Sequence, residues 1–434
     1  FFFLFVLNGK TQEVEILTLE DCLRIGIDNN LSLEGKRKEI QRSKYGVSEN
    51  RSKLLPQINA IAGYSNNFDP PVSVTDGSSY GVPYNITQTL QHSANAGLEM
   101  QMPLFNQTLY TSMSIAKVME EISRLSYGKA REDVILQISK MYYLGQVTAE
   151  QIMLIKANIT RLEELRDITQ AFFDNGMSME VDLKRVNINL ENLKVQYDNA
   201  QAMMKQQLNM LKYIMDYPAE KEIALTPVNT DSITTVALTG LSENIYELQL
   251  SQSQVQLAER QKKIITNGYI PSLSLTGSWR YAAYTDKGYH WFHSGPSNQW
   301  FRSYGVGLTL RIPIFDGLDK TYKIKKAMID IENKRLAWED ARKNLQTQYL
   351  NAVNDLMNNQ RNFKKQKDNY LLAEDVYAVT SDRYREGIAS MTEVLQDEMQ
   401  MSEAQNNYIS AHYNYRVTNL MLLKLTGQIE SLVK

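Results

Sequence analysis

The chain of 434 residues has a single cysteine, ten prolines and 21 glycines, so it has few residues that close disulfides or break helices. Cys22 has no partner for an internal disulfide. The LED that precedes it is not the small-residue sequence of a lipidated N-terminus, and we expect a thiol buried in a helix. The sparse Pro and Gly argue against a fold made of many short loops.

Charge of one sign and long hydrophobic runs are also lacking. The net charge of -2 excludes both a basic nucleic-acid footprint and a disordered acidic tail, so we expect no nucleic-acid partner. The longest strongly apolar run is FFFLFVL at 1–7, and nothing later approaches the ~18 residues that a spanning helix requires. We interpret residues 1–9 as the remnant of a secretory signal, which predicts export.

Signals of catalysis are weak. His290 and His293 have a spacing that could bind metal, but no third ligand is near, and loop surface is the favoured interpretation. GKT at 9–11 lacks the preceding glycine of a phosphate-binding loop, and a lone GVG in a strand pattern is no dinucleotide motif. We therefore predict no enzyme, no cofactor and no metal site.

What the chain does contain is a tandem duplication. LEMQMPLFNQT at 98–108 has a near-copy in LTLRIPIFDGL at 308–318. Further matches follow in the same order and at a nearly constant offset: Pro56 with Pro271, Pro103 with Pro313, Gly176 with Gly387, and Asp182 with Glu393. The period is too long for a solenoid repeat, so each half is one copy of a single unit.

Long helices are predicted in each copy. The interval is 73 positions from Pro103 to Gly176 and 74 from Pro313 to Gly387, with no proline between. Such a helix would be roughly 100 Å long. Aromatic and leucine residues recur every seventh position in the second copy, as in a coiled coil: Tyr349, Leu356, Phe363, Tyr370, Tyr377 and Tyr384. Each glycine then lies at the tip of a helical hairpin, where a left-handed residue turns the chain.

Four segments alternate with the period of a strand, and long loops separate the two strands of each pair. They are QINAIAGYS (57–65), ANAGLEMQM (94–102), SLSLTGSWRY (272–281) and SYGVGLTLRIP (303–313). A soluble half-buried sheet would show the same alternation. However, Glu99, Arg280 and Arg311 share the polar face, as in a water-filled lumen, and Trp279, Tyr281 and Tyr304 fit membrane interfaces.

Four membrane strands cannot close a barrel, because the smallest have about eight and hydrocarbon excludes open edges. Three copies would supply twelve strands and, from two helical hairpins each, twelve helices. Strand would then meet helix at four prolines, of which the second and fourth end the ladder because they cannot donate to it: Pro56, Pro103, Pro271 and Pro313.

From TLEDCLRIGIDNN through both PxF[ND] junctions and both glycine tips, the chain resembles the TolC-like outer-membrane efflux proteins. The resemblance implies a mainly α homotrimer with a 12-stranded β-barrel in the outer membrane of a Gram-negative bacterium and a long periplasmic α-barrel. It also implies a periplasmic adaptor (membrane fusion) protein and an inner-membrane pump of the RND, ABC or MFS type as partners. The function implied is the passive exit of drugs, toxic compounds or metals.

The resemblance also implies functional positions at the helical tips. The periplasmic gate candidates are Asp182, Tyr384, Glu393, Gln396 and Asp397. The candidates for contact with the adaptor are Asn175, Gly176, Met177, Ser178, Gly387, Ile388, Ala389 and Ser390. Acids repeated around a threefold axis would form rings whose repulsion, or cation binding, biases the constriction.

The expected division of the chain follows the duplication. After the signal remnant come N-terminal periplasmic helices (10–55), a first β-hairpin (56–104), a first helical hairpin (105–216, tip 174–178), an equatorial linker (217–240), a helix (241–270), a second β-hairpin (271–314), a second helical hairpin (315–426, tip 386–390) and a C-terminal equatorial segment (427–434). Two alternatives remain open: a pore-less secreted coiled-coil protein, and a channel dedicated to polypeptide secretion.

Overall fold

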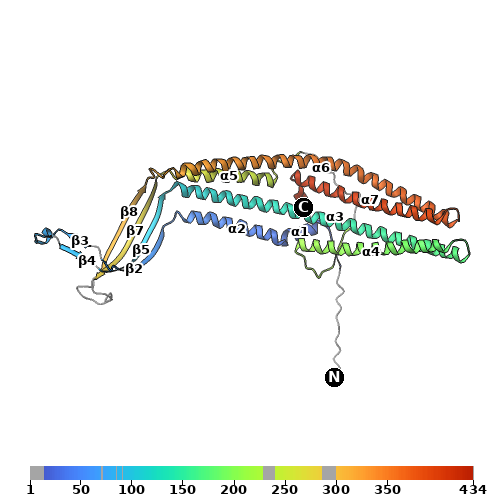
Figure 1. Ribbon diagram of the computed structural model, residues 1–434, viewed down its shortest axis with the longest axis horizontal. Helices are drawn as coiled ribbons and strands as arrows, with labels where there is room; N and C mark the ends of the chain where they lie inside the picture. The colour runs from blue at the N-terminus through green and yellow to red at the C-terminus, as the bar shows by residue number, and fades with distance from the viewer. Residues whose placement is uncertain are drawn as a thin grey trace, which may run out of the picture. The chain divides into compact units, whose positions relative to one another are not determined.

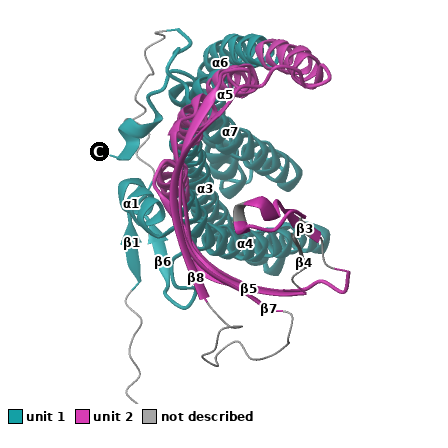
Figure 2. Cartoon of the chain, turned by 90° about the vertical axis from the view of Figure 1, so that its left-hand side faces the viewer, with its two compact units in different colours: residues 1–39, 123–252, 337–434 teal, residues 40–122, 253–336 magenta. Residues whose placement is uncertain are grey.

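The computed structural model describes residues 14–69, 72–84, 86–89, 91–227, 240–285 and 300–433. The proposed signal remnant, the GKT sequence, His290 and His293 lie outside these ranges. The chain divides into two compact units, shown in Figure 2: the first comprises residues 1–39, 123–252 and 337–434, and the second residues 40–122 and 253–336.

The second unit contains a four-stranded antiparallel sheet (Figure 1). Its strands are β2 (Gln57–Asn66), β5 (His92–Phe105), β7 (Ser272–Thr285) and β8 (Trp300–Arg311), in the order β2-β5-β7-β8. The pairing of β5 with β7 joins the two copies of the repeat. Among the described residues, β2 and β8 have no further partner, so both edges of the sheet are open.

The register places the alternating residues as predicted. Leu98 pairs with Trp279, which pairs with Tyr304, on the apolar face, and Glu99 pairs with Ser278 on the polar face. The apolar face is exposed to its surroundings: Val306 is 80% and Leu308 is 66% exposed. A soluble sheet would bury such a face against a second layer, so this one requires another apolar environment.

Three of the four prolines flank strands, and the fourth corrects a prediction. Pro56 and Pro271 directly precede β2 and β7, and Pro313 follows β8. Pro103 does not end its strand, because β5 continues to Phe105, and Pro103 itself pairs with Ser274. The register shifts between Pro103 and Phe105. An irregular position tolerates a residue that cannot donate a hydrogen bond, so the ladder is disturbed here and resumes.

The segment between β2 and β5, expected to be a loop, contains ordered structure. β3 (Val72–Thr75) pairs antiparallel with β4 (Ile86–Thr89), and a 3₁₀ turn, η1 (Gly77–Tyr80), lies between them. Local turn chemistry explains η1: the Asp76 side chain accepts a hydrogen bond from the Ser78 N–H at 2.9 Å.

Two long helical hairpins dominate the chain (Figure 1). The first consists of α3 (Gln107–Asp174) and α4 (Glu180–Met215), and the second of α6 (Asp319–Arg385) and α7 (Met391–Leu425). Shorter helices are α1 (Leu19–Asn29), α2 (Leu31–Ser52) and α5 (Tyr246–Asn267). Within the described ranges, no helix combines the length and the apolar character needed to cross a bilayer.

Two short elements of the first unit were not predicted. β1 (Glu15–Leu17) pairs parallel with β6 (Ile223–Leu225), and the 3₁₀ turn η3 (Ile429–Val433) packs near α1. The strands have three residues each, too few for a periodic pattern to be recognised in the sequence. A buried cluster around Cys22, Tyr142 and Ile429 joins these elements, so Cys22 is the expected buried helix thiol.

The seven-residue pattern of the second copy forms a packed seam in the first unit. Tyr349 and Leu356 are buried in one cluster, and Tyr377 and Tyr384 in another nearer the tips. Between them, the Phe363 ring lies 4.9 Å from the His412 ring and 5.7 Å from the Tyr415 ring, centroid to centroid. The aromatic repeat therefore packs α6 against α7, as a coiled-coil seam requires.

Candidate functional site

Both helical tips turn on a left-handed glycine. Gly176 has φ 71° and Gly387 has φ 76°. The N–H of the following residue reaches back to the helix it leaves, from Met177 to the Phe172 carbonyl at 2.7 Å and from Ile388 to the Arg383 carbonyl at 2.8 Å. This is the Schellman pattern of helix termination, and it gives the two tips the same backbone form.

The return helices begin with acids in equivalent positions but with different caps. Ser390 is the N-cap of α7, and its hydroxyl accepts from the Glu393 N–H while the Glu393 carboxylate accepts from the Ser390 N–H, each at 3.3 Å. In the first copy Met179 takes the N-cap position of α4 and offers no side-chain hydrogen bond. Glu393 therefore stabilises a helix start, whereas Asp182 is released from that role.

Asp182 instead takes part in a link between the two hairpins. One guanidinium nitrogen of Arg185, Nη1, lies 3.4 Å from the Asp182 Oδ1 and donates to the Thr392 hydroxyl at 3.3 Å. Thr392 belongs to the first turn of α7, next to Glu393. The structure thus brings the start of α4 and the first turn of α7 together through Arg185, a residue that no sequence motif marks.

Tyr384 is buried beside the same tip. Its hydroxyl lies 3.3 Å from the Thr169 hydroxyl, and its ring centroid is 5.6 Å from that of Phe172. Burial raises the pKa of Tyr384, the Thr169 hydrogen bond lowers it, and the nearby Asp182 charge raises it again. A neutral tyrosine in this position joins α6 to α3 and supports the turn.

The remaining gate candidates differ in their surroundings. Gln396 is exposed, and Asp397 lines a groove between α6 and α7 together with Asn369 and Gln400. Glu398 is buried in the seam, and burial raises its pKa above the ordinary value. No single-sequence pattern separates this buried acid from its solvated neighbours.

The predicted adaptor contacts are not all accessible. Asn175, Gly176, Met177, Gly387, Ile388 and Ser390 are exposed, and Ser178 is half-buried. Ala389 is only 9% exposed and belongs to the hydrophobic cluster of the tip, so its side chain supports the turn instead of facing a partner. Met177 and Ile388, 68% and 63% exposed, form equivalent apolar points on the two tips.

The polar face of the sheet gathers the predicted lumen residues. Glu99 of β5 and Arg280 of β7 form an ion pair across the two central strands. Arg311 is exposed on the same face, at the last position of β8. A hollow of about 480 Å³ lies on this face and is lined by Asn59, Gln101 and Thr276 among others, so the polar face is the concave one.

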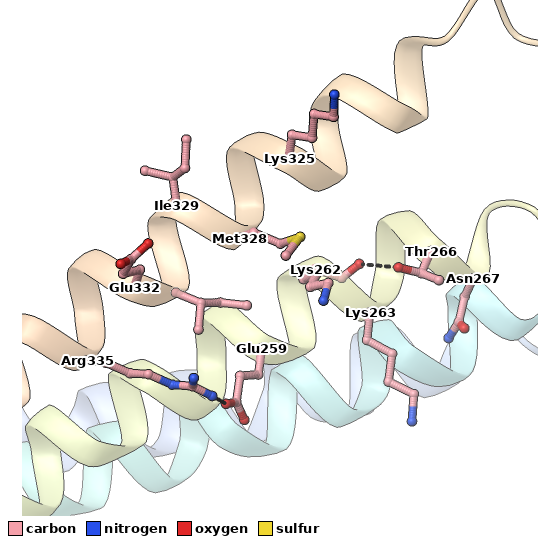
Figure 3. Close-up of a pocket in the computed structure, with 11 residues that line it drawn as sticks. Glu259, Lys262, Lys263, Thr266, Asn267, Lys325, Met328, Ile329, Glu332 and Arg335 are labelled. Carbon is pink, nitrogen blue, oxygen red and sulfur yellow. Dashed lines mark hydrogen bonds and ion pairs between the residues drawn. The ribbon is translucent and has the colours of Figure 1, made fainter.

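A second hollow lies in the second unit between α5 and α6 (Figure 3). Arg335 pairs with Glu259 at 2.8 Å across it, and Lys262, Lys263 and Met328 also line it. It is an open groove with mixed charge. In the part of the chain that the structure describes, no three His, Cys, Asp or Glu side chains gather as a metal site would require.

An open sheet with a lipid-type face, joined to long helical hairpins, defines one protomer of an outer-membrane channel. The family model for outer membrane efflux proteins matches residues 25–215 and 237–428, which correspond closely to the two copies. The chain belongs to this family, whose members are channels. It is therefore an exit duct of an efflux system in the outer membrane.

Individual relatives agree. The chain is 21% identical to the outer membrane protein TolC of Vibrio cholerae serotype O1 over 399 residues, covering 88% of this chain and 84% of the relative. It is 23% identical over 431 residues to the toluene efflux pump outer membrane protein TtgC of a Pseudomonas putida strain, with 94% and 82% covered.

Solved structures share the fold. CusC superimposes with a TM-score of 0.78 at 16% identity, over 94% of this chain and 91% of that one. The open state of the Neisseria gonorrhoeae MtrE channel gives a TM-score of 0.75 at 17% identity, over 94% and 88%. The mainly helical fold with a β-barrel part, predicted from the sequence, is confirmed.

Proposed function

We propose that three copies of the chain form one duct, in which β8 of each copy pairs with β2 of the next to close a 12-stranded barrel. The observation that carries this proposal is the four-stranded sheet with an exposed apolar face and two open edges. In hydrocarbon, unpaired backbone groups at those edges would each cost several kcal/mol. Pairing between identical copies satisfies them all.

In this assembly the two helical hairpins of each copy form a periplasmic tunnel. The linker at 217–240 and the C-terminal segment at 427–434 form an equatorial belt around it, a role that the β1–β6 pairing and η3 support. The exposed tip residues, Met177 and Ile388 foremost, contact a periplasmic adaptor protein. An inner-membrane pump of the RND, ABC or MFS type supplies the energy.

Small molecules are the proposed cargo, because a relative covering most of this chain is described as a toluene efflux protein. Glu99, Arg280 and Arg311 line the lumen that they cross. Dedicated polypeptide secretion would instead be indicated by a gene for a secretion ATPase beside this one.

The assembly is tested on detergent-extracted protein. We expect light scattering to give the mass of three chains of 49.9 kDa each, and planar bilayers to show cation or anion conductance. A protein that stays monomeric in detergent, or that leaves the membrane without detergent, would refute the duct.

For the gate we propose that Asp182 and Glu393 each form an acidic ring at the tip. Tyr384 and Asp397 lie behind these rings. Gln396 occupies the position near Glu393 where a further acid would add another ring. Glu393 also caps α7, so charge and cap must be separated. Glu393→Gln removes the charge and keeps an acceptor for the cap, whereas Glu393→Ala removes both.

If the ring acts through charge, both variants weaken block by multivalent cations in single-channel recordings, roughly tenfold for a ~1.4 kcal/mol loss of attraction. If Glu393 acts only as a cap, Glu393→Ala changes the traces and Glu393→Gln does not. The second pattern would remove Glu393 from the constriction.

A further inference from the structure

The segment between β2 and β5 carries an unusual set of exposed apolar side chains. Phe68 is 89% exposed, Tyr80 72% and Tyr84 67%, and Val72 and Val74 of β3 are each 59% exposed. Isolated exposed apolar residues are ordinary on a protein surface, but five within 17 positions indicate a surface that another molecule covers.

Almost no charged residue in this segment would oppose its burial against another molecule. From residue 67 to residue 91 the only charged residues are Asp69 and Asp76. The Asp76 carboxylate accepts hydrogen bonds from the Ser78 N–H at 2.9 Å and the Ser78 hydroxyl at 2.8 Å, so it is occupied within its own turn. Gly81, with φ 75°, closes η1 and leads the chain back to β4.

The position of the β3–β4 hairpin indicates which side of the sheet the covering molecule approaches from. In Figure 1 β3 and β4 project beyond the end of the sheet that is opposite the helices. In Figure 2, viewed from that end, they lie over the concave side of the sheet. The concave side is the polar, lumen-type face, because the hollow lined by Asn59 and Gln101 lies there. The hairpin therefore points away from lipid and toward the pore.

Its length fits the distance it must cover. A closed barrel of twelve strands about 4.8 Å apart, tilted by about 40°, has a backbone radius of about 12 Å. Strands of four residues extend about 14 Å, so a hairpin that starts at the rim reaches the pore axis. Three such hairpins, one from each copy, would meet there.

We propose that these hairpins are an interaction surface for one another and form an aromatic constriction at the outer mouth of the pore, with Tyr80 and Tyr84, which lie at the tip of the hairpin, in contact across the axis. This inference rests on the trimeric duct proposed above. Burial of these two aromatic rings against other copies supplies the attraction, and the rings also line the last point that a cargo molecule passes.

Crosslinking tests the contact. Cys22 does not interfere, because burial raises the pKa of its thiol to about 12. In outer membranes treated with a short bismaleimide, the Tyr80→Cys variant should give covalent dimers. Tyr45→Cys is the matched control: Tyr45 is similarly exposed, at 75%, but lies on α2. It should stay monomeric on denaturing gels.

Conductance tests the consequence. Replacing Tyr80 and Tyr84 together by Ser should raise single-channel conductance roughly 1.5- to 3-fold, because the narrowest part of the outer mouth is widened. A wild-type protein that forms a conducting trimer, while Tyr80→Cys gives no dimer, would overturn the constriction and leave the duct intact. An environment-sensitive dye on the Tyr80→Cys thiol whose emission is that of the dye in lipid would equally overturn the constriction, because the surface would then face the membrane.

Discussion

Asp182 and Glu393 show how the same residue position acquires two roles in a duplicated chain. Each is the third residue of its return helix. Glu393 has a serine at the N-cap and closes a capping box, whereas Asp182 has a methionine there and turns to Arg185. The S-x-x-E pattern of the cap was readable in the sequence, but the contact of Arg185 with Thr392 was not, because 207 positions separate the two.

A single buried acid provides the pH prediction at this scale. Burial raises the pKa of Glu132 from 4.5 to about 7; Lys424 lowers it, and Glu430 and Asp133 raise it again. Between pH 4.5 and 7 the folded protein keeps a proton that the unfolded chain has lost. Stability therefore falls as the pH rises through this range.

Glu132→Gln should remove that loss and raise stability at pH 8 by roughly 1–2 kcal/mol, with no gain at pH 4. Thermal unfolding of the detergent-solubilised protein at the two pH values measures it. An equal shift at both would mean that the amide changes packing and not protonation.

At the scale of the element, the existence of the long helices could be predicted from the sequence, but the residues at which they begin could not all be. The long proline-free runs form α3 and α6, and both turn on the predicted glycine. The return helices start only after the N-cap residues Met179 and Ser390, a detail set by hydrogen bonds of the cap. Pro103 within β5 shows the limit of a local rule, since neighbouring strands keep the ladder together on both sides of it.

Two glycines distinguish the cost of left-handed backbone strain from the cost of a steric clash. A Cβ at Gly387 or at Gly35 would meet no atom within 4 Å, but Gly387 has φ 76° whereas Gly35 lies inside α2. Gly387→Ala should cost about 1–2 kcal/mol through left-handed strain. Gly35→Ala should stabilise by up to about 1 kcal/mol. Apparent melting temperatures that move the same way in both variants would contradict this account.

At the scale of the whole molecule, the open sheet is the feature that the proposed trimer would complete. The strand pattern alone was compatible with a soluble half-buried sheet. The observed sheet leaves its apolar face uncovered, with Leu310 60% and Tyr304 77% exposed. Membership of the outer membrane efflux protein family explains that exposure, because lipid covers the face.

Adjacent residues of β8 test which face meets lipid. Leu308 lies on the apolar face and Thr309 on the polar one. Leu308→Arg should cost roughly 2–4 kcal/mol if it lies near the bilayer midplane and should deplete trimers from the outer membrane, whereas Thr309→Arg faces water and should assemble normally. Trimer bands from membrane fractions compare the two, and the reverse order would exchange the faces.

By itself the sequence determined the doubling, the two periodicities, the glycine tips and hence the class of fold, because each follows from residues near one another in the chain. The tertiary structure alone decided the contact of Arg185 with Thr392, the burial of Ala389 and Glu398, and the position of the β3–β4 hairpin over the concave face. These depend on which distant segments meet. Contacts across hundreds of positions leave no local period, so only the folded chain reveals them.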